Sequence, residues 1–490
     1  MLSLTRDRGL YVFAVLFSVI LSMWVSAREV VINPDAICYL KSAALFKTDA
    51  MAAVHLCAQS SWPFYSLLIS WVSKLTASYV VAAYILNGIF SLITVVTFLA
   101  IIRFLSATPR IAWFGLLVIL LAHDFNSVKQ YIIRDHGFWA FYLLSIYFLL
   151  HYFRNLQWRF ALLWSVSLII AALFRIEGGF FLLAMPWVAW FDFSRKISER
   201  GKMFLQLNGV TFALILLGGA WVLWRHTLAI GRLDEFFYQI VHGASVLQRN
   251  FLEYEATLAT KILNSSANGQ VGIVLTLVLA LWYVISVIAS LSLVYAGLMI
   301  YGFCKKSIVV ERNHGLVLGM YVLINVAVTA VFMAENMFLS KRYLLALSLT
   351  LMIFVPFALE KIYCQCQKRQ WMLILVLAAI FLSGVGGIFD FGYSKKYIRD
   401  AGVWVSDNVP QNKTILSNDL QVMYYTQHFG NDIFTKAKLF AEMSEKSWNK
   451  YDYIILRTGK NHIKPLHLIE VKRFCNKRGD TVAIYKSVVA

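Results

Sequence analysis

The sequence contains few charged residues. Only 14% of its 490 residues are charged, whereas 60% are hydrophobic and 15% aromatic. So little charge cannot cover the surface of a water-soluble protein of this length, which excludes a soluble globular class. With a mean hydropathy of +0.66, the composition is that of an integral membrane protein.

Motifs of several well-known chemistries are also missing. The chain has no HExxH, no P-loop and no acidic motif of nucleotide-sugar enzymes. The cysteines have no metal-site spacing, so we expect no metal held by cysteine. Cys38 and Cys57 share one predicted outer loop, where they could form a disulfide or serve as small packing residues. No internal repeat is visible, which argues against a secondary transporter built from two similar halves.

Acidic residues are scarce relative to basic ones, and the net charge is +19. The basic residues flank apolar runs throughout the chain, as membrane topology and anionic headgroups require, and do not gather in one patch. We therefore expect membrane lipids as partners and no nucleic acid.

Apolar runs predict about eleven membrane-spanning helices. The first is retained, because its apolar run is long and Ser26-Ala27-Arg28 is a poor cleavage site. Lysine and arginine are denser in alternate loops, which places the N-terminus inside and segments 28–78 and 225–270 outside. The predicted spans lie at about 10–27, 79–102, 111–123, 137–152, 160–174, 178–191, 203–224, 271–302, 315–334, 343–359 and 371–389.

The run from Ala161 to Phe191 decides this topology, because it contains Arg175 and Glu177. We interpret it as two short spans with a hinge at 174–179. The split keeps the basic clusters on both sides of it inside. It also spares the bilayer centre two charges, each costing about 2.5–3.5 kcal/mol on insertion scales.

The chain becomes polar after Phe389. Helical patterns at 396–408 and from 421, with strand patterns at 414–417, 451–456 and 481–485, predict a small α/β domain. We divide the chain into a transmembrane domain, 1–389, and a soluble outer domain, 390–490. This domain is either a structural cap or a part of acceptor recognition.

Acids and arginines stand at the outer ends of predicted spans. Asp35 follows the first span after Pro34, and Arg134-Asp135 opens the fourth. Each has a structural interpretation beside a functional one: Asp35 could cap a helix starting at Ala36, and Arg134-Asp135 could be a charge pair at a helix start. Likewise, Arg175 could pair with Glu177. Lys341 and Arg342 could anchor a span at the interface.

In their order and common sidedness these features resemble bacterial GT-C glycosyltransferases, of the protein mannosyltransferase and lipid A aminoarabinose transferase type. The resemblance spans nearly the whole chain and rests on Asp35 after the first span, Ser61-Trp62-Pro63-Phe64-Tyr65, Arg134-Asp135, Phe174-Arg175-Ile176-Glu177-Gly178, Lys341-Arg342-Tyr343, and the tail from Ala401 through Ser417-Asn418-Asp419 to Tyr424-Tyr425. It implies a mainly α-helical bundle with a periplasmic α/β domain, and a sugar donor carried on a polyprenyl phosphate.

The resemblance and the chemistry of the transfer suggest roles. Phosphate is already a good leaving group, so the reaction needs a base for the acceptor hydroxyl and cations for the departing charge. We assign Asp35 as the base and Arg342, Lys341 and Arg175 to the donor phosphate. For Asp135, grouped with Asp35 as catalytic, three roles stay open: binding acceptor, orienting Arg134, or sharing a divalent cation such as magnesium or manganese with Asp35. The substrate-binding candidates are Arg134, Tyr39, Tyr65, Glu177 and Glu335.

The sequence thus predicts a multi-pass glycosyltransferase of the bacterial inner membrane with outward-facing catalysis. Its acceptor would be an envelope glycan, a lipid or a protein. The main alternative is a membrane oligosaccharide ligase or polymerase, which would use the segment 225–270 with its charged residues Arg232, Asp234, Glu235, Arg249, Glu253 and Glu255. A transporter is the less favoured alternative.

Overall fold

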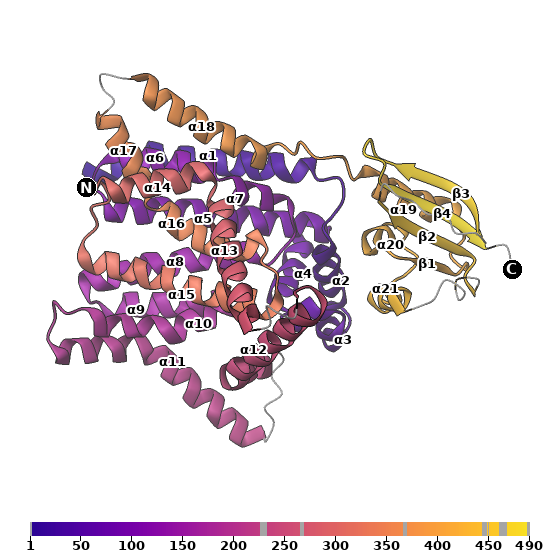
Figure 1. Cartoon of the computed structure of the whole chain (residues 1–490), viewed down its shortest axis with the longest axis horizontal. Coiled ribbons are helices and arrows are strands. Elements are labelled where there is room, and N and C mark those ends of the chain that lie inside the picture. The colour runs from indigo at the N-terminus through magenta and orange to yellow at the C-terminus, as the bar shows by residue number, and fades with distance from the viewer. Residues whose placement is uncertain are drawn as a thin grey trace. The chain divides into compact units, whose positions relative to one another are not determined.

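The computed structural model describes residues 2–225, 233–264, 269–365, 370–442, 448, 450–459 and 468–487. These residues are mainly helical, with a small sheet near the C-terminus (Figure 1). The chain divides into two compact units. Unit 1 consists of Met1–Met23, Asn87–Lys129 and Arg134–Phe389, and unit 2 of Trp24–Leu86, Gln130–Ile133 and Asp390–Ala490.

Unit 1 is a bundle of apolar helices. Two further helices, α1 (Leu2–Arg28) and α5 (Tyr79–Leu105), each contain a boundary between the units, and so does the short η2, whose last residue Gln130 belongs to unit 2. The described elements of the bundle are α6 (Pro109–Leu120), α7 (His123–Ser127), η2 (Val128–Gln130), α8 (Asp135–Asn155), α9 (Trp158–Phe174), α10 (Glu177–Ala184), η3 (Met185–Phe191), α11 (Ile197–Arg225), α12 (Leu233–Lys261), α13 (Val271–Leu291), α14 (Leu293–Cys304), α15 (Arg312–Asn336), α16 (Lys341–Met352), α17 (Val355–Gln365) and α18 (Gln370–Ile388).

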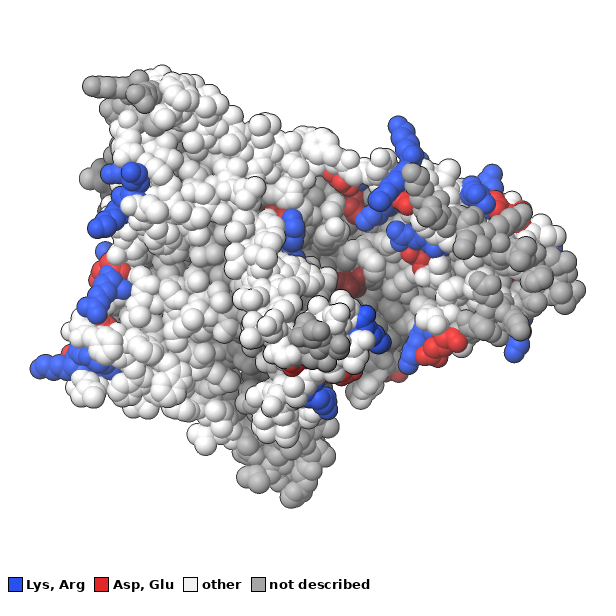
Figure 2. All heavy atoms as spheres, in the orientation of Figure 1, with Lys and Arg blue, Asp and Glu red and all other residues white. Residues whose placement is uncertain are grey.

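The multi-pass membrane fold predicted from the sequence is confirmed. Six of the described helices are long and apolar enough to cross a membrane, or eight if each of two bent helix pairs is one span. Three more apolar helices are shorter: Trp158–Phe174, Glu177–Phe191 and Leu293–Cys304. On the face shown in Figure 2, lysine and arginine gather at one end of the bundle and a wide uncharged band follows, as expected for a surface in lipid.

The predicted span 137–152 corresponds to α8, which is largely buried. Polar side chains join it to its neighbours. The Tyr142 hydroxyl is hydrogen-bonded to Thr350 Oγ1 of α16 at 2.8 Å and accepts from Asn325 Nδ2 of α15 at 2.6 Å. Such bonds hold helices together where the lipid supplies no hydrophobic drive for their association.

The predicted hinge between two short spans is observed. Helix α9 ends at Phe174, Arg175 is extended (φ −144°, ψ 134°), and α10 begins at Glu177. Gly178 lies so close to α9 that a Cβ there would stand 2.5 Å from the backbone nitrogen of Ala172. The turn therefore requires glycine at this position.

The predicted single span 271–302 is instead two helices. They meet at Ser292, whose φ is 71° and whose side chain accepts a hydrogen bond from the Tyr295 N–H. No proline or glycine marks this break, which is why the apolar run appears continuous in the sequence. Of the predicted outer segment 225–270, residues 226–232 (with Arg232) and 265–268 lie outside the described part, and the side chains of Asp234 and Glu235 are likewise not described. The remainder is mainly α12.

Unit 2 combines helices after the first span with the C-terminal segment. A parallel pair joins β1 to β2, and antiparallel pairs join β2 to β4 and β4 to β3. The predicted α/β region is thereby confirmed, around a core that includes Leu416, Ile454 and Tyr485. The described elements of this unit are α2 (Pro34–Leu45), α3 (Ala50–His55), η1 (Ala58–Ser61), α4 (Phe64–Thr76), α19 (Lys396–Asn408), β1 (Ile415–Ser417), α20 (Leu420–Thr426), α21 (Ile433–Glu442), β2 (Tyr453–Thr458), β3 (Leu468–Cys475) and β4 (Thr481–Ser487).

Candidate functional site

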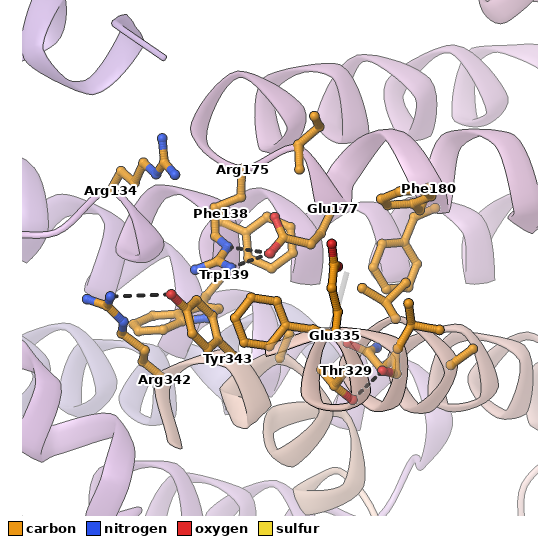
Figure 3. Close-up of a pocket in the computed structure, with 18 residues that line it drawn as sticks. Arg134, Phe138, Trp139, Arg175, Glu177, Phe180, Thr329, Glu335, Arg342 and Tyr343 are labelled. Atoms are coloured by element: carbon orange, nitrogen blue, oxygen red, sulfur yellow. Dashed lines mark hydrogen bonds and ion pairs between the residues drawn. The ribbon is translucent and has the colours of Figure 1, made fainter. Parts of the chain in front are cut away.

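A cavity of about 450 Å³ opens in unit 1 between α8, the α9–α10 turn, α15 and α16 (Figure 3). This volume is in the range of small-molecule sites. Five charged side chains line the cavity: Arg134, Arg175, Glu177, Glu335 and Arg342. All five were singled out from the sequence, and the structure brings them to one place from four helical segments.

Arg175 is the most constrained of these residues. Its guanidinium is buried and forms ion pairs with Asp135 at the start of α8 and with Glu177 at the start of α10. It also lies 4.6 Å from the centre of the Tyr343 ring. The pairing of Arg175 with Glu177 follows one of the two interpretations of the sequence, but the bond to Asp135 was not expected. Because Arg175 already pairs with two carboxylates, its guanidinium is less available to bind a phosphate.

Arg134 and Arg342 present the other two guanidinium groups. Arg134 Nη1 is buried and has no hydrogen-bond partner among the described residues. Arg342 lies 5.2 Å from the centre of the Tyr343 ring and donates to the Tyr343 hydroxyl at 3.4 Å. Guanidinium forks match the geometry of phosphate oxygens. These two residues are therefore better placed for an anion than Arg175.

The remaining cavity wall is aromatic and aliphatic. Phe180 and Phe332 line it, together with Val331, which is 50% exposed on the membrane-spanning helix α15. Deeper in α15, Asn325 and Thr329 contribute polar groups, and Thr329 Oγ1 is hydrogen-bonded to the Tyr283 hydroxyl at 2.7 Å. Asn325 and Thr329 were not among the residues predicted from the sequence, although two polar residues four apart in an apolar helix lie on one face.

Lys341, which was assigned to the phosphate, lies outside this lining. Its ammonium is 3.3 Å from Asp124 Oδ1, and the same carboxylate oxygen is 2.8 Å from His123 Nδ1. Asp124 is buried, and no feature of the sequence marked it. The structure therefore gives Lys341 a carboxylate partner and gives Arg342 a place in the cavity.

Asp35 belongs to unit 2, in the first turn of α2. The helix begins at Pro34 with Asn33 at the N-cap position, so the alternative in which Asp35 caps a helix starting at Ala36 is wrong. Its carboxylate accepts a hydrogen bond from Gln59 Nε2 at 3.3 Å. Cys38 and Cys57 form a disulfide, which is one of the two arrangements that the sequence left open.

Tyr39 and Tyr65, the aromatic substrate-binding candidates, face each other between α2 and α4. They are 3% and 1% exposed, and their rings meet edge to face at 5.1 Å. This contact packs the two helices together. Among the described residues, no group of three or more His, Cys, Asp or Glu side chains is arranged to hold a metal ion.

No protein-family model and no curated protein sequence matches the chain. Solved membrane proteins do match its structure. The archaeal oligosaccharyltransferase AglB from Archaeoglobus fulgidus aligns with a TM-score of 0.55 at 11% identity, covering 92% of this chain and 70% of AglB. ArnT from Cupriavidus metallidurans in the apo state aligns at 0.54 and 13% identity, covering 99% of both chains. ArnT bound to undecaprenyl phosphate aligns at 0.51 and 13% identity, covering 98% of both.

The chain shares their fold. This agreement extends along the whole length of ArnT, including the C-terminal segment. The resemblance to GT-C membrane glycosyltransferases that the sequence indicated is therefore confirmed at the level of the fold.

Proposed function

We propose that this protein is a glycosyltransferase of the bacterial inner membrane. It moves a sugar from a polyprenyl-phosphate donor to an envelope glycan, a lipid or a protein on the periplasmic face. The observation that carries the proposal is the cavity of unit 1, where arginines stand beside an apolar wall in a chain with this fold.

The donor class follows from the two kinds of lining. A polyprenyl phosphate joins an anion to a hydrocarbon chain, and the cavity offers Arg134 and Arg342 beside Phe180, Val331 and Phe332. The similar proteins support this choice, because AglB was solved in complex with a dolichol-phosphate and ArnT bound to undecaprenyl phosphate.

The reaction is an inverting single displacement. An acceptor hydroxyl oxygen attacks the anomeric carbon, the bond from that carbon to the phosphate oxygen breaks, and the phosphate leaves with the electron pair. Asp35 takes the proton of the hydroxyl, and the guanidinium groups of Arg134 and Arg342 stabilise the charge that grows on the phosphate. Asp135 and Glu177 hold Arg175 in place beside them.

The cysteines support a periplasmic location for the loop with Asp35. Disulfides form and persist in oxidising compartments, and the Cys38–Cys57 disulfide lies in this loop. Cys304 ends α14 and Cys364 lies in the last turn of α17. Both belong to segments predicted to face the cytoplasm, and both are free. We accordingly place the N-terminus in the cytoplasm and the C-terminal segment in the periplasm.

Replacement of Asp35 by asparagine tests the function. We expect envelope glycans of cells lacking the protein to lose one sugar, measured by mass spectrometry, and wild-type protein to restore it. Asp35→Asn should transfer about 10²–10⁴-fold more slowly, because the base is lost while the hydrogen bond from Gln59 can persist.

The matched control is Asp49→Asn in the same loop. Asp49 caps α3 by accepting from Met51 N and Ala52 N, and asparagine caps equally well. This variant should restore the sugar fully. Unchanged glycans in cells without the protein would refute the proposed activity, and full transfer by Asp35→Asn at normal protein levels would refute the role of Asp35.

A further inference from the structure

The loop before Asp35 is held by the C-terminal segment of the chain. Ile32 has both of its backbone polar groups bound by side chains of α20. Its N–H donates to the Tyr425 hydroxyl at 3.0 Å, and its carbonyl accepts from Gln421 Nε2 at 2.6 Å. Ile32 and Gln421 are 7% and 6% exposed. Buried backbone groups outside helices and strands need hydrogen-bond partners. For Ile32, the side chains of α20 supply both of them.

Arg457 on β2 fixes the orientation of the side-chain amide of Gln421. Its Nη1 donates to Gln421 Oε1 at 3.2 Å and to Asp419 Oδ2 at 2.6 Å. Asp419 in turn caps α20 by accepting from Val422 N at 2.9 Å. Because a guanidinium can only donate, it holds the amide oxygen of Gln421 on its own side and leaves the NH₂ group for Ile32. The sheet, α20 and the loop are thus joined by one directed chain of hydrogen bonds.

The residues that follow Ile32 are tied as well. Asn33 brackets the backbone of Ile132, accepting from its N–H at 2.9 Å and donating to its carbonyl at 3.3 Å. Asp35 accepts from Gln59, and Cys38 is bonded to Cys57. Every one of these partners belongs to unit 2. The carboxylate of Asp35 therefore stands on a short segment with fixed points before and after it.

We infer that the C-terminal segment is a positioning element of the reaction, in which Gln421 and Tyr425 set the loop that carries Asp35 and Arg457 orients Gln421. The inference rests on the proposed function, because it takes Asp35 as the base. A base must meet the acceptor hydroxyl at hydrogen-bond distance, and a misplacement of about 1 Å can cost 10²-fold in rate. This role differs from both that the sequence left open for the segment, a structural cap or a part of acceptor recognition.

The test uses Gln421→Glu and Tyr425→Phe in the full-length protein. Gln421→Glu keeps the size and the contact with Arg457 but turns a carboxylate oxygen toward the Ile32 carbonyl, where a donor is needed. Tyr425→Phe leaves the Ile32 N–H without its acceptor. The matched control is Tyr424→Phe, which removes a hydroxyl from the neighbouring ring of the same helix.

Three measurements separate positioning from folding. Hydrogen exchange of the purified protein should rise at least about tenfold at residues 31–37 in both variants while exchange in β4 stays as in the wild type. Sugar transfer in cells, measured by mass spectrometry of envelope glycans, should fall about 10- to 100-fold. Binding of undecaprenyl phosphate to the purified protein should not change, because the residues proposed to hold it belong to unit 1. Tyr424→Phe should leave all three measurements unchanged.

Each other outcome refutes a specific claim. Unchanged exchange at residues 31–37 in Gln421→Glu would overturn the inference, as would an equal rise in β4. Full transfer in Gln421→Glu beside lost transfer in Asp35→Asn would overturn the positioning role alone. Full transfer in Asp35→Asn would overturn the proposed role of the base, whatever the exchange data show.

Discussion

Asp135 and Glu177 in unit 1 and Asp35 in unit 2 are held in different ways. In unit 1, Asp135 and Glu177 are bound to the buried guanidinium of Arg175, so their charge is compensated within the bundle. In unit 2, Asp35 accepts from the neutral amide of Gln59, and its segment is fixed by backbone hydrogen bonds and a disulfide. A site for an anion needs fixed positive charge, and the cavity of unit 1 has it in Arg134 and Arg342. This supports the proposal that the donor phosphate binds in unit 1.

Removal of Arg175 should have the largest effect on stability. In Arg175→Met, Asp135 and Glu177 lose their shared cation in a buried site, and breaking such a pair costs about 3–5 kcal/mol. We expect a large drop in the thermal unfolding temperature of the purified protein in detergent. Arg110→Met is the control, because Arg110 pairs with Glu360 at the surface and its loss should have little effect. Equal drops in both variants would show that Arg175 is not part of a buried triad.

Loss of the disulfide should have the next largest effect on stability, and this effect should fall on unit 2. The cysteines are 19 residues apart in sequence, and a link across a loop of this size stabilises by about 3 kcal/mol. In Cys38→Ser/Cys57→Ser, limited proteolysis should cut segment 28–78 faster than in the wild type. Cys475→Ser, at an exposed free cysteine, provides the comparison. Unchanged proteolysis of the double variant would mean that the hydrogen bonds alone hold the loop.

How far the sequence predicts these two units depends on the range of the interactions. Helix α19 covers the predicted residues 396–408, because its amphipathic pattern and the following Pro410 are local signals. The hinge at Arg175 was also predictable, since charges avoid the bilayer centre. Strand β3 was not, because five of its eight residues are exposed and its Lys472 and Arg473 hide the strand pattern.

The same limit applies to the site. The sequence indicated Arg134, Arg175 and Arg342 because each stands at the end of a predicted span. It could not show that Arg175 bonds to Asp135, which is 40 residues away, or that Lys341 pairs with Asp124 while its neighbour lines the cavity. The partner that each of these side chains binds depends on how the helix ends face their neighbours in the folded protein. Gln421 and Arg457 carried no signal at all, because their role exists only once the sheet and the first loop have come together.

The neighbouring residues Lys341 and Arg342 offer a sharper test of unit 1, with a smaller effect. Arg342→Gln should weaken binding of undecaprenyl phosphate about 10- to 100-fold, the loss expected for one or two charge-assisted hydrogen bonds. Lys341→Gln should change the affinity little, because Lys341 lies outside the cavity lining. The dissociation constants of the purified variants decide this. A larger loss of affinity in Lys341→Gln than in Arg342→Gln would show that the phosphate binds beside Asp124 and not in the cavity.

Replacement of Glu29 should give the smallest effect, and it shows how burial acts on a carboxylate of unit 2. The pKa of Glu29 is raised from 4.5 to about 7. Burial is the largest cause, and Asp390 also raises the pKa, whereas Lys395 and Arg28 lower it. Between these two pH values the folded state binds more protons than the unfolded chain, so the free energy of unfolding falls as pH rises and levels off above about 7. Glu29→Gln imitates the protonated form and should remove this slope. The variant should match the wild type near pH 4.5 and unfold at a higher temperature at pH 8. Glu253→Gln, at an exposed glutamate of α12, controls for the loss of one negative charge. A pH-independent difference between Glu29→Gln and the wild type would show that burial of this carboxylate does not oppose its charge.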